Sequence, residues 1–186
     1  MRSYLLAGLR MLVILTVLLG VIYPLAVTGI SQLTMSHRAN GSLVRSDGAV
    51  VGSALLAQAF EGDQWFQPRP GSYDPAASGA SNLGPNNPDL IDNVRGAVDA
   101  LRKQDGVEAG DPIPADAVTT SGSSLDPDIT PAYAKLQAPR VAAARGLGVQ
   151  DVLALIDRQT TGRTFGFLGD PRVNVLLLNL ALERLA

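Results

Sequence analysis

The sequence predicts one N-terminal transmembrane helix followed by one mixed α/β domain outside the cytoplasm. Residues 11–36 contain no charged side chain, and Leu, Val, Ile and Ala dominate the first two thirds of this run. The remaining residues, 37–186, suit one compact domain in length. In that part, short apolar segments alternate with stretches of helical periodicity and turn signals. We therefore divide the chain into a cytoplasmic N-terminus (1–10), a transmembrane helix (11–36) and a soluble domain (37–186).

The apolar run fits a retained helix better than a cleaved signal. About 20 apolar residues cross the hydrocarbon core as a helix, whereas the apolar core of a secretory signal usually has about 7–15. Ala26-Val27-Thr28 resembles a small-x-small cleavage site only weakly. Pro24 lies inside the run and lacks a backbone donor, so we expect a mild kink.

The second half of this helix carries small and polar residues, which in lipid favour contact between helices. The alternative is a bare anchor whose polar end lies in the membrane interface. We predict that a partner helix contacts Gly20, Tyr23, Pro24, Thr28, Gly29 and Gln32.

The distribution of basic residues does not decide the orientation. Arg2 and Arg10 precede the helix, and Arg38 and Arg45 follow it closely. Long soluble domains cross the membrane largely regardless of charge. We therefore expect a cytoplasmic N-terminus and an extracytoplasmic domain in the cell inner (plasma) membrane.

The elements of the domain follow from turn and cap signals. Asp47-Gly48 predicts a hairpin turn, Asn87-Pro88 and Thr130-Pro131 predict helix starts, and Pro139 predicts an interruption or a kink. A Pro-, Gly-, Ser- and Asn-rich stretch over 68–88 predicts a long loop. The predicted strands are 43–45, 49–51, 65–66, 118–120 and 173–177; the predicted helices are 87–104, 130–146, a set of turns from Val149 to Ile156 that stops near Gly162, and 179–185.

Composition removes most catalytic machinery. The chain has no Cys and a single His, His37, so thiolate metal sites and multi-histidine sites are excluded. Neither of its two lysines, Lys103 and Lys135, follows a Gly, so no GxxxxGK[ST] phosphate loop exists. A formal charge of −2 argues against nucleic acid as a partner.

The segment from Ser121 to Asp128 concentrates Ser, Gly and Asp. A serine nucleophile needs a positioned base, and the only His lies at the membrane border, so a capped turn is the favoured interpretation. Asp126 and Asp128 could attract a cation, because hard cations prefer oxygen ligands, but they lack the spacing of a calcium loop. We predict no bound metal here, only a possible cation-attracting loop.

Segments along nearly the whole chain resemble one family in order. They include the membrane-helix run Gly20–Leu25, the Ser/Gly/Asn loop Ser78–Pro85 and the C-terminal run Pro171–Leu176. Together they resemble the small C subunit of the bacterial Kdp potassium-transporting P-type ATPase, the KdpC family. Other matching segments are Asn40–Leu43, Gly52–Leu55, Gln58–Phe60, Arg69-Pro70, Tyr73-Asp74, Leu125–Pro127, Gln137, Pro139–Val141, Ala144–Gly146 and Leu178–Leu182.

The resemblance implies an accessory subunit of a high-affinity, ATP-driven potassium uptake complex. Its implied partners are a P-type catalytic subunit, a potassium-binding channel-like subunit and a small membrane subunit. The family is described as raising the ATP affinity of the P-type subunit in a transient complex, as a catalytic chaperone, with no tightly bound cofactor. Gln137 is the matching residue implied for nucleotide contact. The chain lacks the Asp-Lys-Thr-Gly phosphorylation motif, since no Asp precedes either Lys.

Two other classes remain open from the residues alone. A membrane-anchored extracytoplasmic hydrolase would use Ser and carboxylates, and an anchored binding module would act without a pump. An extracytoplasmic domain could not touch cytoplasmic ATP directly, so its effect would then pass through the membrane helices, or the domain would act at the potassium entrance.

Overall fold

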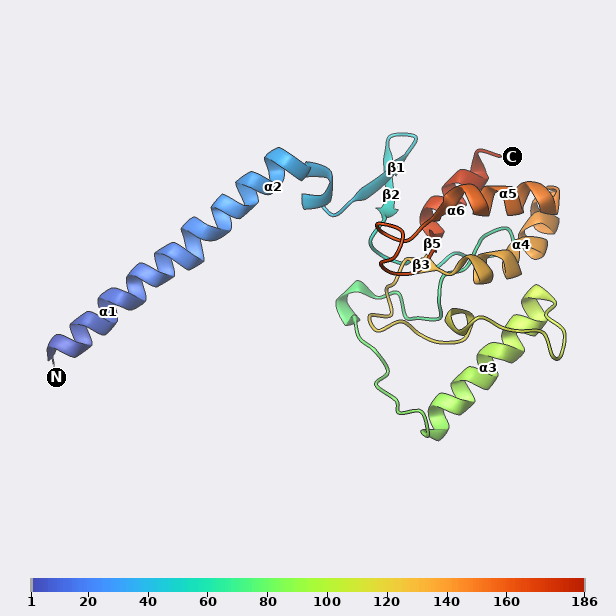
Figure 1. Cartoon of the computed structure of the whole chain (residues 1–186), viewed down its shortest axis with the longest axis horizontal. Coiled ribbons are helices and arrows are strands. Elements are labelled where there is room, and N and C mark those ends of the chain that lie inside the picture. The colour runs from blue at the N-terminus through green and yellow to red at the C-terminus, as the bar shows by residue number, and fades with distance from the viewer. Residues whose placement is uncertain (1, 186) are drawn as a thin grey trace. The chain divides into compact units, whose positions relative to one another are not determined.

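The computed structural model describes residues 2–185 and divides the chain into two compact units, Met1–Leu43 and Val44–Ala186 (Figure 1). The first unit is helical: α1 covers Arg2–Val17, a π-helical turn covers Leu18–Ile22 and α2 covers Tyr23–Ala39. None of the side chains of this helix is buried. The helix Arg2–Ala39 is long and apolar enough to cross a membrane.

The kink expected at Pro24 takes the form of the π-helical turn. Proline has no N–H for the carbonyl four residues earlier, here that of Gly20, and its ring crowds that carbonyl. The backbone N–H of Tyr23 instead donates to the carbonyl of Leu18, five residues earlier. A wide turn at this point is one of the recognised ways in which a helix absorbs such a break. A second break lies at Met35, whose backbone is non-helical (φ −146°, ψ 46°).

The hairpin predicted around Asp47-Gly48 is confirmed. Strand β1 covers Leu43–Ser46 and β2 covers Ala49–Ser53. Both turn residues have positive φ, 50° for Asp47 and 82° for Gly48. Such a pair of central residues matches the twist of the two strands.

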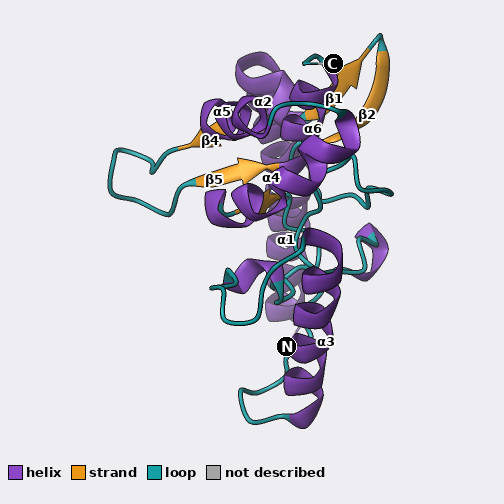
Figure 2. Cartoon of the chain, turned by 90° about the vertical axis from the view of Figure 1, so that its right-hand side faces the viewer, coloured by secondary structure: helices purple, strands orange, loops and turns teal. Residues whose placement is uncertain are grey.

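The second unit packs four helices with a small antiparallel sheet (Figure 2). Helix α4 (Pro131–Arg145) packs against α5 (Val149–Gln159), and α5 packs against α6 (Val175–Glu183). The strand order is β3-β5-β4, with bounds Asp128–Ile129, Arg172–Asn174 and Thr160–Thr161. In the pairing, Ile129 and Thr160 both lie opposite Val173. The core lies between these elements and includes Phe66, Val141, Ile156, Val173, Leu178 and Leu182.

The helix starts predicted at Asn87 and Thr130 are confirmed. Helix α3 covers Pro88–Asp105, and the Asn87 side chain accepts a hydrogen bond from the backbone N–H of Asp89. The Thr130 side chain likewise accepts from the N–H of Tyr133 at the start of α4. Helix α4 continues through Pro139, so Pro139 does not interrupt it. Helices α3 and α4 end at Gly106 and Gly146, and both glycines have the left-handed conformation that is common at the C-terminal end of a helix.

Two predicted strands are wrong because side chains occupy the backbone groups that a strand would pair. At residues 65–66 the carbonyl of Trp65 accepts from the Arg140 guanidinium of α4, and the backbone of Phe66 is bonded by the Asn179 amide of α6. At residues 118–120 a 3-10 turn, Ala115–Ala117, precedes irregular chain, and the Arg69 guanidinium takes the carbonyls of Thr119 and Thr120.

The C-terminal boundary between strand and helix lies earlier than predicted. Strand β5 ends at Asn174, whose side chain caps α6 by accepting from the N–H of Leu177. An apolar run cannot by itself distinguish a buried strand from a buried helix. The loop over 68–88 is confirmed and contains one 3-10 turn, Pro75–Ala77.

Candidate functional site

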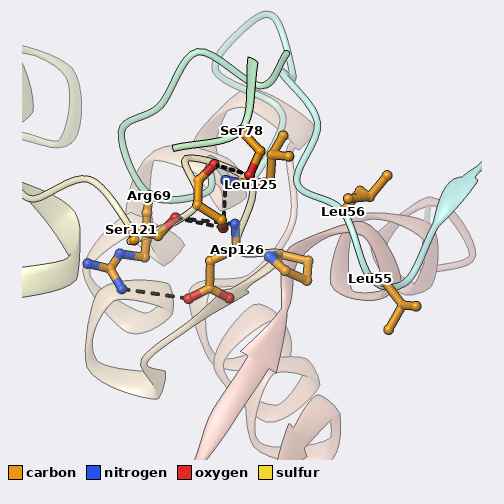
Figure 3. Close-up of a pocket in the computed structure, with 10 residues that line it drawn as sticks. Leu55, Leu56, Arg69, Ser78, Ser121, Leu125 and Asp126 are labelled. Atoms are coloured by element: carbon orange, nitrogen blue, oxygen red, sulfur yellow. Dashed lines mark hydrogen bonds and ion pairs between the residues drawn. The ribbon is translucent and has the colours of Figure 1, made fainter. Parts of the chain in front are cut away.

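The Ser/Gly/Asp segment of the sequence forms one wall of a hollow of about 450 Å³ (Figure 3). Leu55 and Leu56, which follow β2, and Ser78 of the Ser/Gly/Asn loop also line the hollow. Its lining residues are Leu55, Leu56, Arg69, Ser78, Ser121, Gly122, Ser123, Leu125, Asp126 and Pro127.

Arg69 ties this wall together. Its Nη1 lies 3.6 Å from Oδ2 of Asp126, and its Nε and Nη2 donate to the carbonyls of Thr119 (3.3 Å) and Thr120 (2.9 Å). Tyr73 donates its hydroxyl to the carbonyl of Arg69 at 2.7 Å. The guanidinium is therefore engaged by the protein itself and positions the loop that carries Asp126.

The serines act as turn caps and loop ties. Oγ of Ser121 lies 3.4 Å from the N–H of Asp126, and Oγ of Ser123 lies 3.2 Å from the N–H of Leu125. Ser124 donates its hydroxyl to the carbonyl of Gly79 at 2.8 Å, which fixes the Ser/Gly/Asn loop. These contacts support the capped-turn interpretation of the segment. The one histidine, His37, belongs to the helical unit.

Asp126 and Asp128 lie beside arginines. Oδ2 of Asp128 is 3.0 Å from Nε of Arg172, and its Oδ1 accepts from the side-chain amide of Asn174 at 3.2 Å. Burial raises the pKa of Asp128 above its ordinary value of 3.8, while Asn174 and Arg172 oppose that rise. Among residues 2–185, no three His, Cys, Asp or Glu side chains gather where they could hold a metal ion.

Gln137 is fully buried in α4. Its Oε1 accepts from the backbone N–H of Gln67 (2.7 Å), and its Nε2 donates to the carbonyl of the same residue (3.0 Å). A second amide does the same one residue earlier: Asn179 of α6 bonds the N–H (2.9 Å) and carbonyl (3.0 Å) of Phe66. The two amides together replace the neighbouring strand that residues 65–67 lack.

Arg140 of α4 completes this support. Its Nε lies 2.6 Å from Oδ1 of Asp105, and both side chains are almost fully buried, at 6% and 3% exposure. The guanidinium also donates to the carbonyls of Asp63 (2.7 Å) and Trp65 (3.0 Å) and to Oε1 of Gln137 (2.9 Å). Burial raises the pKa of Asp105 above 3.8, and the Arg140 guanidinium opposes this rise.

Sequence reasoning gave no role to Asn179, Arg140 or Asp105. The available signal was Asn179, the one amide inside the apolar run 175–182, because an unpaired amide in a core is costly and so implies a partner. The partner itself lies more than a hundred positions away along the chain, and no periodicity identifies it.

The six predicted partner-contact residues lie along the helical unit, and all six are exposed. A Cβ at Gly29 would meet nothing within 4 Å, and one at Gly20 would meet only Cγ2 of Thr16 at 3.9 Å. Gln32 exchanges two hydrogen bonds of 3.1 Å with Asn40.

Known proteins are similar in sequence to this chain over nearly its whole length. The profile of the family described as "K+-transporting ATPase, c chain" matches residues 5–184. The potassium-transporting ATPase KdpC subunit of Mycobacterium tuberculosis (strain ATCC 25618 / H37Rv) is 51% identical over 189 aligned residues, which cover all of both chains. The subunit of the same name from Caulobacter vibrioides (strain NA1000 / CB15N) is 53% identical and covers 98% of this chain and 94% of its own. That of Paraburkholderia phytofirmans is 50% identical over 92% of each chain. The chain therefore belongs to the KdpC family, the C chains of K+-transporting ATPases.

Proposed function

We propose that the chain is a non-catalytic, accessory subunit of an ATP-driven potassium uptake complex, needed for its assembly. The observation that carries the proposal is the agreement with K+-transporting ATPase C chains over residues 5–184. The geometry supports it, since the serines of the hollow cap turns and its arginine holds backbone carbonyls. These side chains bond backbone groups of the domain and so stabilise its loops, as expected of a subunit with a structural role.

The membrane helix supplies the attachment in this proposal. Its partners are the helices of the P-type catalytic subunit, the potassium-binding channel-like subunit and the small membrane subunit. Gly20 and Gly29 leave open space on the helix surface, where a neighbouring backbone can approach closely. The π-helical turn before Pro24 frees carbonyl groups that a polar side chain of a neighbour can bond.

The influence on ATP use is indirect in this proposal. Both amide atoms of Gln137 are bonded to Gln67, so a nucleotide contact there requires residues 65–67 to leave α4. With the N-terminus in the cytoplasm and the domain outside, ATP stays on the opposite side of the membrane. The subunit then raises the ATP affinity of the P-type subunit through the helices that it binds.

Two measurements on the intact complex test attachment and orientation. An affinity tag on the chain should co-purify the three other subunits, and a version with residues 11–36 replaced by an unrelated apolar helix should not. Protease added to spheroplasts should remove a tag placed after Ala186 and spare one placed before Met1, both outside the described residues 2–185. Co-purification by the replaced helix contradicts the attachment, and the reverse protease pattern restores direct nucleotide contact by Gln137.

A further inference from the structure

The loop between β4 and β5 carries the two most exposed large apolar side chains of the second unit. Phe165 is 84% exposed and Phe167 is 71% exposed, and Leu168 beside them is 49% exposed. Two of the four phenylalanines in the chain thus face solvent, whereas Phe66 is fully buried. Figure 2 shows this loop extending away from the helices of the domain.

The loop is a built hairpin rather than loose chain. The backbones of Thr164 and Leu168 exchange two hydrogen bonds of 2.9 Å, one in each direction. Phe165 has a φ of 54° and Gly166 a φ of 81° at the turn between them. A bulky residue is uncommon at positive φ, so the turn holds a phenylalanine at its tip where Asn or Gly would form it more readily.

Basic residues surround the base of this hairpin. The segment 158–172 contains Arg158, Arg163 and Arg172 against one acid, Asp170, which gives a formal charge of +2. Arg163 pairs with Asp170, and Arg172 pairs with Asp128 of β3, each at 3.0 Å. Even when Asp128 is counted, the base stays positive in a domain whose 13 basic and 17 acidic residues give −4.

The domain follows the apolar helix after a short link. Helix α2 ends at Ala39 and β1 begins at Leu43, so three residues join them. Extended chain spans at most about 3.5 Å per residue, so this link reaches about 10 Å. The domain that carries the hairpin is therefore tethered to the helical unit by a short link.

We propose that this hairpin is a bilayer contact: Phe165, Phe167 and Leu168 enter the membrane interface, and the arginines at its base meet anionic lipid headgroups. Aromatic side chains favour the interfacial region, and basic residues beside an apolar face strengthen binding to anionic lipid. A projecting tip of two phenyl rings with cations at its base fits this surface better than it fits a protein partner, whose interface would have to supply both a deep pocket and negative charge.

Spin labelling of the full chain tests the proposal, because the natural sequence has no cysteine. A nitroxide is attached to Leu168→Cys, or to Ile91→Cys on α3 as the matched control. Each chain is inserted into vesicles of phosphatidylcholine alone or of phosphatidylcholine with phosphatidylglycerol. Collision rates are measured with oxygen, which concentrates in hydrocarbon, and with a water-soluble nickel chelate.

The proposal expects the label at position 168 to collide mainly with oxygen and the label at position 91 to collide mainly with the nickel chelate. The preference at 168 should increase with phosphatidylglycerol and decrease with salt. Phe165→Ser with Phe167→Ser should return the label at 168 to water, with the unfolding midpoint reported by Trp65 unchanged. Equal nickel access at 168 and 91 in both kinds of vesicle would overturn the proposal. Shielding of 168 that arises only when the other subunits are added in detergent would overturn it in favour of a protein partner.

Discussion

The side-chain amide of Asn179 forms two hydrogen bonds with the backbone of Phe66, at 2.9 Å to its N–H and 3.0 Å to its carbonyl. Gln137 forms the same pair with Gln67, at 2.7 and 3.0 Å. Two helices of the C-terminal half thereby hold a two-residue segment that lies 70 and 113 positions away along the chain. The side chains of Phe66, Gln137 and Asn179 at the centre of this contact are fully or almost fully buried.

Asn179→Ala should destabilise the domain strongly. It leaves the buried N–H and carbonyl of Phe66 without partners, and each such group costs about 1–3 kcal/mol. We expect a loss of about 3 kcal/mol in the free energy of unfolding of the full chain in detergent, followed by the fluorescence of Trp65. Asn93→Ala on the exposed side of α3 is the matched control and should change this free energy by at most about 0.5 kcal/mol. Similar losses for the two variants would show that the amide of Asn179 contributes little.

Sequence patterns predicted the elements whose ends are set locally. The Asp47-Gly48 turn and the caps Asn87 and Thr130 act over a few residues, so their chemistry is visible in the sequence. The strand predicted at 65–66 is wrong because its backbone groups are bonded by the side chains of Asn179 and Arg140, which are distant in sequence.

The candidate site shows the same division. Asp126 was singled out for its residue type, but its partner Arg69 was not, because the two meet only through folding. The family resemblance identified the chain from many short segments in order, although it assigned no role to Arg140 or Asp105. What the sequence could not supply is the set of long-range contacts between buried polar groups.

The buried pair of Arg140 and Asp105 should give the domain a specific pH dependence. A carboxyl whose folded pKa is raised contributes stability that is fully present below its unfolded pKa, near 3.8, and is lost as pH rises through the folded pKa. Arg140→Met removes the cation that opposes the rise in the pKa of Asp105, so the stability that is lost as pH rises should become larger. Breaking such a buried pair costs about 3–5 kcal/mol near neutral pH. We therefore expect Arg140→Met to lose more unfolding free energy at about pH 7 than at about pH 4.

The double variant Arg140→Met with Asp105→Asn separates charge from packing. With no carboxylate left at position 105, the extra pH dependence should disappear, although the hydrogen bonds of Arg140 to the carbonyls of Asp63 and Trp65 remain lost. An equal loss for Arg140→Met at both pH values would mean that Asp105 does not titrate in this range.

Gly20→Leu with Gly29→Leu should weaken binding to the other subunits without harming the helix itself. A Cβ at Gly29 meets nothing within 4 Å, and one at Gly20 meets only Thr16 at 3.9 Å, so the chain tolerates both larger side chains. Loss of close helix packing worth about 1.4 kcal/mol lowers co-purification about tenfold. Gly8→Leu is the matched control, since it also meets nothing within 4 Å and lies outside the predicted contact surface. If the natural chain, the double variant and the Gly8→Leu control co-purify the other subunits equally, the contact lies elsewhere.

Neutralising Asp126 and Asp128 together should change the apparent potassium affinity of the complex by about threefold at most. Each carboxylate lies beside an arginine, at 3.6 Å for Asp126 and 3.0 Å for Asp128, which reduces its pull on a free cation. Screening limits the remainder over about 10 Å at 0.1 M salt, so the effect should be larger at low ionic strength. Asp92→Asn with Asp99→Asn on α3 removes the same charge and serves as the control. Loss of transport by an intact Asp126/Asp128 variant complex would mean that these carboxylates hold an ion directly.

The most direct test of the accessory role is the ATP dependence of potassium-stimulated hydrolysis, measured on the purified complex with and without this chain. The isolated full chain should hydrolyse no ATP. The complex that lacks it should show weaker potassium-stimulated hydrolysis with a higher half-saturating ATP concentration, and adding the full chain should restore both values. Hydrolysis by the chain alone, or the same ATP dependence in its absence, would contradict the account.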